Sequence, residues 1–340
     1  MNHNKFFSLI LGLTATVFSV QKSAAQVDPH FSQYYIYPMG LNPALTGAMD
    51  GDYRVSAIYR SQWGTVTSPY STVGISADMA TNRNINVGVN LYNQKAGNGG
   101  YNYTNGYFSI AYTGVKFGPD KLQCLSFGFQ GGLLSRRFDP YKFQFGEQWM
   151  PGTGYNAGMP SGERFEKTTS SVFDAGFGIA YYDMDPEKNA ALFGGVSAFH
   201  LTQPKDPFLK DGNKSAMPVH YSAHLGARIH LNETVLFVPN AKYSIQGNAQ
   251  EKMLGAYFQL MANETTDFML GANWRMNDAL VPFAGVYFKG MTIGLSYDAN
   301  VSQLGKIANS NSVNSFELSI SFVGKRRNSI RTDYFKCPRF

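Results

Sequence analysis

The sequence is poor in charged residues and in cysteine, and after its first residues it has no long apolar run. Lys, Arg, Asp and Glu together make up only 15% of the chain. Beyond residue 25, no stretch reaches the roughly 18 consecutive apolar residues that indicate a transmembrane helix, so a membrane protein built from helices is not expected. The two cysteines, Cys124 and Cys337, do not have the spacing of a metal site. We therefore expect no bound metal.

Motifs of catalysis are missing as well. No serine stands in a Gly-x-Ser-x-Gly turn, and no P-loop, Rossmann fingerprint or Cys/His zinc pattern occurs. His220, His224 and His230 fall on one face of one predicted strand, but residues four apart in a strand are separated by about 13 Å, too far to bind one ion. We expect a protein that is not an enzyme and has no cofactor. An outer-membrane hydrolase assembled across strands is a distant alternative.

The first 25 residues have the form of a secretory signal peptide. Asn4-Lys5 supply a basic start, an apolar run extends from Phe6 to Val20, and Ser23-Ala24-Ala25 place small residues at a cleavage site. We expect cleavage after Ala25, with an uncleaved anchor as the alternative. The export route leads to a compartment that permits disulfides.

After residue 52 the chain repeats one unit, in which about ten residues alternate apolar with polar or small and then turn. The composition, with 35 Gly, 21 Tyr and 26 Phe, suits such strands. The predicted strands begin near Tyr53, Tyr70, Ile85, Asn102, Leu122, Ser171, Ala191, Val219, Val235, Lys252, Asp267, Val281, Met291 and Ser315. Fourteen is an even number, as in single-chain bacterial outer-membrane barrels. Pro239 and Pro282 fall inside predicted strands, where a bulge would be needed to accommodate them.

Loop lengths separate a membrane barrel from a soluble β-sandwich, whose strands also alternate. The connections over 136–170, 201–218 and 300–313, which follow odd-numbered strands, are long. The connections over 80–84, 183–190, 232–234 and 289–290, which follow even-numbered strands, are short. Long loops at one end and short turns at the other are typical of a transmembrane barrel. We therefore predict an all-β fold, an antiparallel outer-membrane barrel of about 14 strands over residues 53–323, with both termini periplasmic.

The sequence pI is about 9.1, and most of the net positive charge lies in the last residues of the chain. Residues 324–340 form a basic tail that we expect to be periplasmic and to bind partners. Its cations are Lys325, Arg326, Arg327, Arg331, Lys336 and Arg339. The body is close to neutral, so no nucleic-acid partner is expected. Such a tail suits acidic protein surfaces or the anionic head groups of lipid.

The predicted inner face of the barrel carries nearly balanced charge. Its cations are Arg54, Arg60, Arg228, Lys242 and Arg275, and its anions are Asp78, Asp174, Asp298 and Glu317. An ion-selective pore would favour one sign. The balance favours ion pairs across neighbouring strands.

Residues 26–52 differ from the rest, because they are aromatic but are interrupted by proline. We predict that this segment plugs the lumen or its periplasmic mouth, since a barrel of fourteen strands encloses space. The residues of the predicted plug are Phe31, Tyr34, Tyr35, Tyr37, Asn42 and Pro43. A flexible leader is the alternative.

Cys124 has inward parity near the periplasmic start of its strand, and the tail that bears Cys337 is also predicted to be periplasmic. We therefore expect that these two residues can form a disulfide, with two unpaired thiols as the alternative.

Several short motifs, in this order and spacing, resemble the PorP/SprF family of type IX secretion over nearly the whole mature chain. They are Phe31-Ser32-Gln33-Tyr34, Asn42-Pro43-Ala44, Tyr59-Arg60-Ser61-Gln62-Trp63, Ile293-Gly294-Leu295-Ser296-Tyr297-Asp298 and Cys337-Pro338-Arg339-Phe340. The resemblance implies an outer-membrane barrel that works with the type IX secretion machinery. It also implies a role in the export or surface anchoring of cargo with a C-terminal secretion domain, such as gliding adhesins, and it carries over no catalytic residues.

We therefore expect a barrel that binds proteins: secretion components, exported cargo and outer-membrane lipid. The outer loop over 136–170, which contains Trp149, would face the cargo. The alternative is a channel for small or hydrophobic solutes, in which the same N-terminal segment is a hatch.

Overall fold

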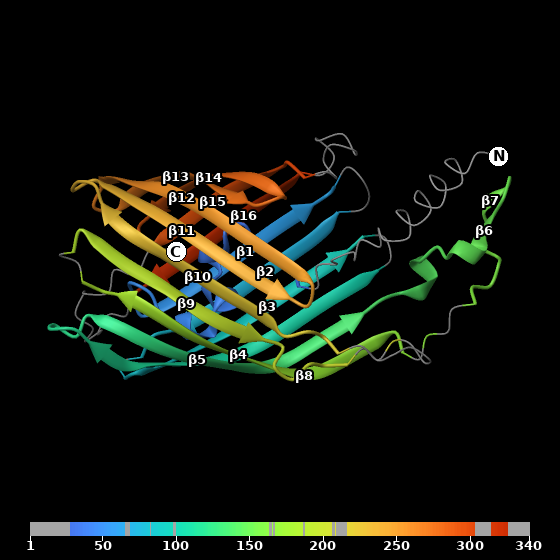
Figure 1. The fold of residues 1–340 in the computed structure, drawn as a ribbon, viewed down its shortest axis with the longest axis horizontal. Helices are drawn as coiled ribbons and strands as arrows, with labels where there is room; N and C mark the ends of the chain where they lie inside the picture. The colour runs from blue at the N-terminus through green and yellow to red at the C-terminus, as the bar shows by residue number, and fades with distance from the viewer. Residues whose placement is uncertain are drawn as a thin grey trace, which may run out of the picture.

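The computed structural model describes residues 28–64, 69–81, 83–97, 100–162, 165, 167–185, 188–205, 208, 216–302 and 314–325. Fourteen long strands form one closed barrel in which each strand pairs antiparallel with the strands beside it, and the first pairs with the last (Figure 1). They are β1 (Tyr53–Gln62), β2 (Tyr70–Met79), β3 (Ile85–Ala96), β4 (Tyr101–Phe117), β5 (Gln123–Arg137), β8 (Thr169–Asp183), β9 (Ala190–Phe199), β10 (His220–His230), β11 (Val235–Gln246), β12 (Ala249–Asn263), β13 (Thr266–Arg275), β14 (Ala279–Phe288), β15 (Met291–Asn300) and β16 (Ser315–Gly324). The predicted fold and strand count are confirmed.

The alternation seen in the sequence becomes an inside and an outside. In β16, the small and polar side chains of Ser315, Glu317, Ser319 and Ser321 are buried in the lumen. The side chains between them are exposed on the outer wall, and they are Phe316, Leu318, Ile320 and Phe322. Other strands repeat this pattern, which gives the wall the apolar outer surface of a transmembrane barrel.

No helix within the described residues is long and apolar enough to cross a bilayer.

The two ends of the barrel differ as the loop lengths predict. The β5–β8, β9–β10 and β15–β16 connections lie at one end, which we call the loop end. The opposite end, where β1 begins and β16 ends, has only short connections, and we call it the turn end.

The longest connection contains structure that the sequence did not predict. After β5 come two 3-10 turns, η3 (Pro140–Lys142) and η4 (Gly146–Gln148), and then the short strands β6 (Trp149–Met150) and β7 (Gly154–Tyr155). The latter pair antiparallel as a hairpin that lies at the loop end, beyond the barrel wall (Figure 1). Two-residue strands are too short to carry an alternating pattern, so the sequence contains no signal for them.

Both strand prolines interrupt pairing on one side only. Pro239 of β11 pairs in register with β12, but the ladder to β10 is broken between Gly226 and Ile229. Pro282 of β14 pairs with β13, whereas the ladder to β15 is broken beside it. A proline cannot donate a backbone hydrogen bond, and each barrel strand absorbs this loss on one of its two edges.

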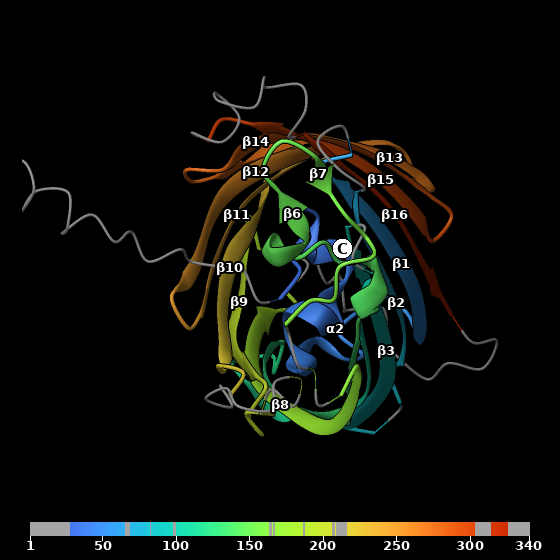
Figure 2. The same ribbon diagram turned by 90° about the vertical axis from the view of Figure 1, so that its right-hand side faces the viewer.

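The residues before β1 run through the lumen. Residues 28–52, which we call the inner segment, begin at the loop end, where Asp28 contacts His200 and His220 beside the ends of β9 and β10. They finish at the turn end, where the Asp52 amide donates to the Gly324 carbonyl at 2.8 Å. Between these points lie η1 (Tyr34–Ile36), α2 (Pro38–Leu41) and η2 (Pro43–Leu45). Figure 2 shows α2 inside the ring of strands.

The inner segment therefore runs the length of the lumen, and which of its ends faces the periplasm stays a prediction. Asp28 lies at the loop end of the lumen and not at the turn end, where β1 begins. The sequence marks the segment as apolar but holds no information about its direction. The direction is set by its partners on distant strands.

The core of the molecule lies in the lumen, between the inner segment and the wall. Tyr35 packs edge-on against Phe283, with ring centroids 5.5 Å apart, and also contacts Tyr257. On the other side, Phe31 packs edge-on against Tyr37 and Tyr92. Aromatic pairs at these distances add to the apolar area that they bury.

Candidate functional site: the occupied lumen

At the turn end, an ion pair of the wall binds the backbone of the inner segment. Arg54 of β1 pairs with Asp78 of β2 at 2.7 Å, and both side chains are buried. The remaining guanidinium N–H groups donate to the carbonyl oxygens of Leu45 and Ala48, each at 3.2 Å. The Gly47 amide donates to the Asp78 carboxylate at 2.7 Å. A buried ion pair is stable only when its other hydrogen-bonding positions are filled, and here the inner segment fills them.

In the middle of the barrel, glycines in the wall make room for η2. A Cβ built on Gly128 of β5 would lie 2.1 Å from the amide nitrogen of Ala44, and one built on Gly178 of β8 would lie 2.0 Å from Oδ1 of Asn42. Asn42 caps η2 through the Ala44 amide and donates to the carbonyl of Ile179 at 3.0 Å. The side chain of Asn42 therefore joins the turn to the wall.

Tyrosine hydroxyls fix the half of the inner segment nearer the loop end. Tyr34 donates to Oδ1 of Asn240 at 2.6 Å, and Tyr37 donates to the carbonyl of Leu91 at 2.9 Å. Both side chains are buried. A buried phenol needs a polar partner, and the wall provides one for each ring.

A cluster of charged side chains holds Ser32 and Gln33. Glu317 accepts the Ser32 amide at 2.7 Å and the Gln33 amide at 2.9 Å, and it pairs with Arg60. Asp298 pairs with Arg60 at 2.8 Å and also with Arg275. Four strands, β1, β13, β15 and β16, thus contribute to one buried network that binds the backbone of the inner segment.

The first described residue is bound by histidines. The Asp28 carboxylate lies 2.8 Å from Nε2 of His200 and 3.1 Å from Nδ1 of His220, and the hydroxyl of Tyr103 donates to it. The second ring nitrogen of His200 lies 2.6 Å from Asp174. His200 also has a positive φ of 58°, which marks it as a constrained position.

The pKa values of this pair reflect their mutual contact. Burial alone would raise the pKa of Asp28, but the charge and hydrogen bonds of His200 and His220 outweigh it and hold the pKa below its usual value. Burial alone would lower the pKa of His200, but Asp28 and Asp174 outweigh it and raise the pKa well above its usual value. The two groups are therefore an ion pair at neutral pH.

Most of the charges predicted for the inner face form ion pairs, although the two pairs made by Asp298 each skip one strand of the barrel. Arg54 pairs with Asp78, Arg60 with Asp298 and Glu317, and Arg275 with Asp298. Lys242 pairs at 2.9 Å with Glu251, a residue outside the charges predicted for the inner face. The network is an internal scaffold, and it does not give the lumen one dominant sign.

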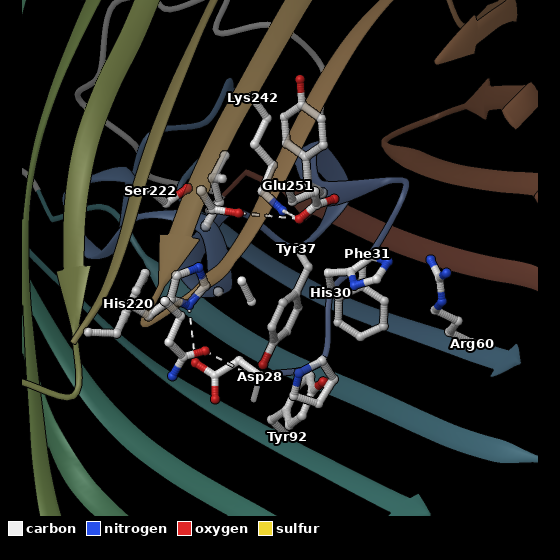
Figure 3. A pocket seen from close by; sticks show the side chains of 18 of the residues that line it. Asp28, His30, Phe31, Tyr37, Arg60, Tyr92, His220, Ser222, Lys242 and Glu251 are labelled. Atoms are coloured by element: carbon white, nitrogen blue, oxygen red, sulfur yellow. Dashed lines mark hydrogen bonds and ion pairs between the residues drawn. The ribbon is translucent and has the colours of Figure 1, made fainter. Parts of the chain in front are cut away.

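A cavity of about 450 Å³ remains at the loop end, between the inner segment and the barrel wall (Figure 3). Phe31 and Tyr37 form part of its lining from the inner segment, and Lys242, Glu251 and Ser222 line it from the wall. The cavity therefore lies where the inner segment leaves the lumen incompletely filled.

The residues predicted for the plug all lie in the lumen. Phe31, Tyr34, Tyr35, Tyr37, Asn42 and Pro43 are buried. That this segment blocks passage stays a prediction. Trp149 lies in β6 with 55% of its surface exposed.

The predicted disulfide and most of the basic tail involve residues outside the described ranges. Cys124 is buried, and its thiol lies 3.6 Å from the carbonyl of Thr113. Cys337 lies outside the described residues, as do Arg326, Arg327, Arg331, Lys336 and Arg339. Lys325, which directly follows β16, is the exposed start of the tail.

Two of the histidines of β10 lie on its lumenal face. His220 binds Asp28, while His224 lies buried further along the same face of β10. Across the described residues, no group of three or more His, Cys, Asp or Glu side chains is arranged to hold a metal ion.

Sequence reasoning missed Asp28 and His200 and the glycines that make room for η2. Asp28 and His200 lie outside the strands, so no alternation places them on a face. Gly128 and Gly178 have inward parity, and a glycine in the middle of an inward-facing row was the available signal for close backbone approach.

The fold and the lumen define an outer-membrane β-barrel whose interior is occupied by its own N-terminal segment. Residues 23–322 match the family described as "Type IX secretion system membrane protein PorP/SprF", and the chain belongs to this family. No curated protein sequence matches it.

Among solved structures, similar chains include the toluene transporter TbuX of Ralstonia pickettii, with 11% identity and a TM-score of 0.49, covering 84% of this chain and 92% of that one. The P. putida toluene transporter TodX has 12% identity and a TM-score of 0.49, with 85% and 93% covered. A Pseudomonas aeruginosa FadL homologue has 10% identity and a TM-score of 0.46, with 83% and 92% covered.

Proposed function

We propose that this barrel supports the export of type IX secretion cargo, or its anchoring at the cell surface, by binding proteins. The cargo would carry a C-terminal secretion domain, as gliding adhesins of this system do. Family membership supports the proposal. The observation that carries it is the occupied lumen, because a segment fixed to the wall from Asp28 to Asp52 suits a binding platform better than an open conduit.

The proposed orientation places the loop end outside the cell and the turn end in the periplasm. Long loops on the outer side and short periplasmic turns are the usual arrangement of such barrels. The outer end would then present two exposed aromatic residues to cargo: Trp149 in the β6–β7 hairpin and Tyr141 in η3. Exposed aromatic side chains are enriched at protein interfaces.

The basic tail would act on the other side. It leaves the turn end at Lys325, where periplasmic proteins or anionic lipid head groups would meet it. A disulfide between Cys124 and Cys337 would hold the tail to the turn end of the barrel, and it stays part of this proposal.

The test is affinity purification of the tagged barrel from cells, after cross-linking, with mass spectrometry of the retained proteins. We expect secretion components and at least one exported protein with a C-terminal secretion domain. Replacing residues 141–160 by a short Gly-Ser linker should remove the exported protein while leaving the barrel folded. A matched control replaces the turn over 231–234 at the opposite end. Equal retention of cargo by both variants would contradict the role of the outer loop.

The alternative, a channel for small or hydrophobic solutes, is tested on the same purified protein. Steady conductance in planar bilayers, together with no recovery of secretion components or cargo, would replace the proposed function by the channel. We expect no steady conductance, because the inner segment crosses the lumen.

A further inference from the structure

Four neighbouring strands carry polar side chains on their outer face at the loop end. They are β3, β4, β5 and β8, which lie side by side in the wall (Figure 1). Their outward side chains form rows, because each outward residue pairs across the ladder with an outward residue of the next strand. The two rows nearest the loop end are polar, and the proposed binding of cargo by the β6–β7 hairpin does not use them.

The row nearest the loop end carries two cations. Lys95 of β3 pairs in register with Asn102 of β4, which pairs with Arg137 of β5. Two strand spacings separate the backbones of the two cations, so these lie about 10 Å apart. Both side chains are exposed, and neither forms an ion pair with a residue in the described ranges. Asp139, which follows Arg137 closely, instead accepts the amide of Tyr141 at 3.2 Å.

The second row carries hydroxyl and amide groups. Asn93 donates to Oδ1 of Asn102 at 2.6 Å and to the hydroxyl of Thr104 at 2.7 Å. Ser171 of β8 donates to the hydroxyl of Ser135 of β5 at 3.0 Å. The row crosses three strand spacings, about 14 Å, which is the width of a disaccharide head group rather than of a single phosphodiester.

Below these two rows the wall is apolar. Leu91 of β3, Leu133 of β5 and Phe173 of β8 form the third row and are exposed on the outer face. A cation on the lipid face of a barrel is costly in the middle of the bilayer and costs little at its edge. The step from Leu133 to Arg137 therefore marks the edge of the apolar zone. A lipid on this face would place its acyl chains on the third row and its head group on the two polar rows.

The opposite side of the wall is different. Trp274 of β13 and Leu280 of β14 are exposed apolar side chains that lie one residue from the loop end of their strands. Lys252 of β12 is an outward cation whose ammonium lies 6.0 Å from the ring centre of Tyr243. Two cations above a polar row are thus a local feature of β3, β4, β5 and β8.

We propose that the outer face of these four strands, at the loop end, binds a phosphorylated glycolipid. Lys95 and Arg137 bind phosphate, because their hydrogen bonds to it are charge-assisted. The second row binds sugar hydroxyls, and the third row packs against acyl chains. Phosphorylated glycolipids belong to the outer leaflet of bacterial outer membranes, so the site rests on the proposed orientation of the loop end and not on the binding of cargo.

Native mass spectrometry of the purified full chain measures this binding directly. The protein is exchanged into a nonionic detergent until no lipid adduct remains. It is then titrated with diphosphoryl lipid A, a disaccharide glycolipid with two phosphates, and separately with dioleoylphosphatidylglycerol. We expect one retained lipid A for each barrel, with a Kd in roughly the micromolar range, and phosphatidylglycerol binding at least about tenfold weaker.

Variants of exposed side chains separate the two polar rows. Lys95→Gln combined with Arg137→Gln should weaken lipid A binding about tenfold or more, since two charge-assisted hydrogen bonds are lost. Lys95→Arg keeps the charge and should bind as the wild type does. Thr104→Val combined with Ser171→Ala should weaken lipid A binding about fivefold and leave phosphatidylglycerol unaffected. The matched control, Lys252→Gln, should change lipid A binding by less than about twofold.

Three outcomes would contradict the proposal. Failure of the wild type to retain lipid A would overturn it, as would equal retention by the Lys95, Arg137 double variant and by Lys252→Gln. Phosphatidylglycerol that binds as tightly as lipid A through the same two cations would assign the face to phospholipids and overturn the choice of a glycolipid. The titration uses the isolated barrel, so its failure leaves the cargo proposal standing, and absence of cargo from the pull-down leaves the lipid site standing.

Discussion

The two halves of the inner segment are held in different ways. Towards the turn end, the wall binds backbone: Arg54 reaches carbonyl oxygens, and glycines of β5 and β8 let η2 touch the strands. Towards the loop end, side-chain ion networks bind the segment, and a cavity lies beside it. Close backbone contact therefore fixes the half towards the turn end, whereas side chains fix the other half and leave space beside it.

The largest effect on stability is expected in the half towards the turn end. Arg54→Ala leaves the buried Asp78 carboxylate without its partner and frees two carbonyl groups, which should cost about 3–5 kcal/mol of stability. The temperature at which the barrel loses its compact migration in gel electrophoresis should fall. Arg83→Ala, in an exposed turn at the same end, is the control and should change stability by less than about 0.5 kcal/mol. Equal shifts would mean that the buried pair does not fix this half.

Gly128→Ala tests whether close contact seals the lumen. Its added methyl would meet the backbone of Ala44, so η2 must move away from β5. We expect ion conductance to appear in planar bilayers. The control is Gly131→Ala in the same strand, where the nearest atom is the movable ring end of Phe173 at 3.3 Å. If the folded Gly128→Ala variant shows no conductance, the contact between η2 and β5 is not what closes the lumen.

The loop-end half should depend on pH. The pKa of His200 is raised in the folded state. The stability that His200 contributes is therefore fully present below pH 6.5, its ordinary pKa, and declines as the pH rises towards its pKa in the folded state. The pKa of Asp28 is lowered in the folded state. The stability that Asp28 contributes is therefore fully present above pH 3.8, its ordinary pKa, and is lost as the pH falls below that value. The Asp28–His200 pair should therefore stabilise the position of the inner segment most strongly between pH 3.8 and pH 6.5.

Protease digestion of the residues around Asp28, at pH 6 and at about pH 9, measures this dependence. Cleavage should accelerate at the higher pH after correction for the protease's own pH profile. Asp28→Asn should remove most of the difference, and Asp185→Asn, at a turn-end connection, should retain it. A wild-type rate that does not vary with pH would contradict the role of the pair.

The smallest effect is expected outside the barrel. Trp149→Ala removes a half-exposed side chain of the β6–β7 hairpin and should change barrel stability by less than about 0.5 kcal/mol. Thermal unfolding followed by circular dichroism is the measurement. A large loss would show that the hairpin belongs to the same folding unit as the wall.

Most of the wall could be predicted, because alternation along each strand encodes its two faces. Met291 to Asn300 has a repeat of two residues, and the structure places its polar side chains inwards. The predicted strand starts lie within three residues of the observed ones. The charges on the inner face could be placed in the same way, and most of them pair as expected.

The path inside the lumen could not be predicted, since it depends on contacts between residues far apart in the chain. Asp28 finds His200 across 172 positions, and Ser32 finds Glu317 across 285. No local pattern encodes such a pairing. The aromatic content of the inner segment shows only that it needs burial, so its direction and the cavity beside it were out of reach.

The hydrogen bonds from Ser32 and Gln33 to Glu317 join the start of the described chain to its last strand. They can form only once β16 is in place, and β16 also closes the ring against β1. Contacts of such long sequence separation form late in folding. In the simplest assembly route, the inner segment therefore lies between the strands before the barrel closes. If the barrel closed first, the segment would have to thread through its full length.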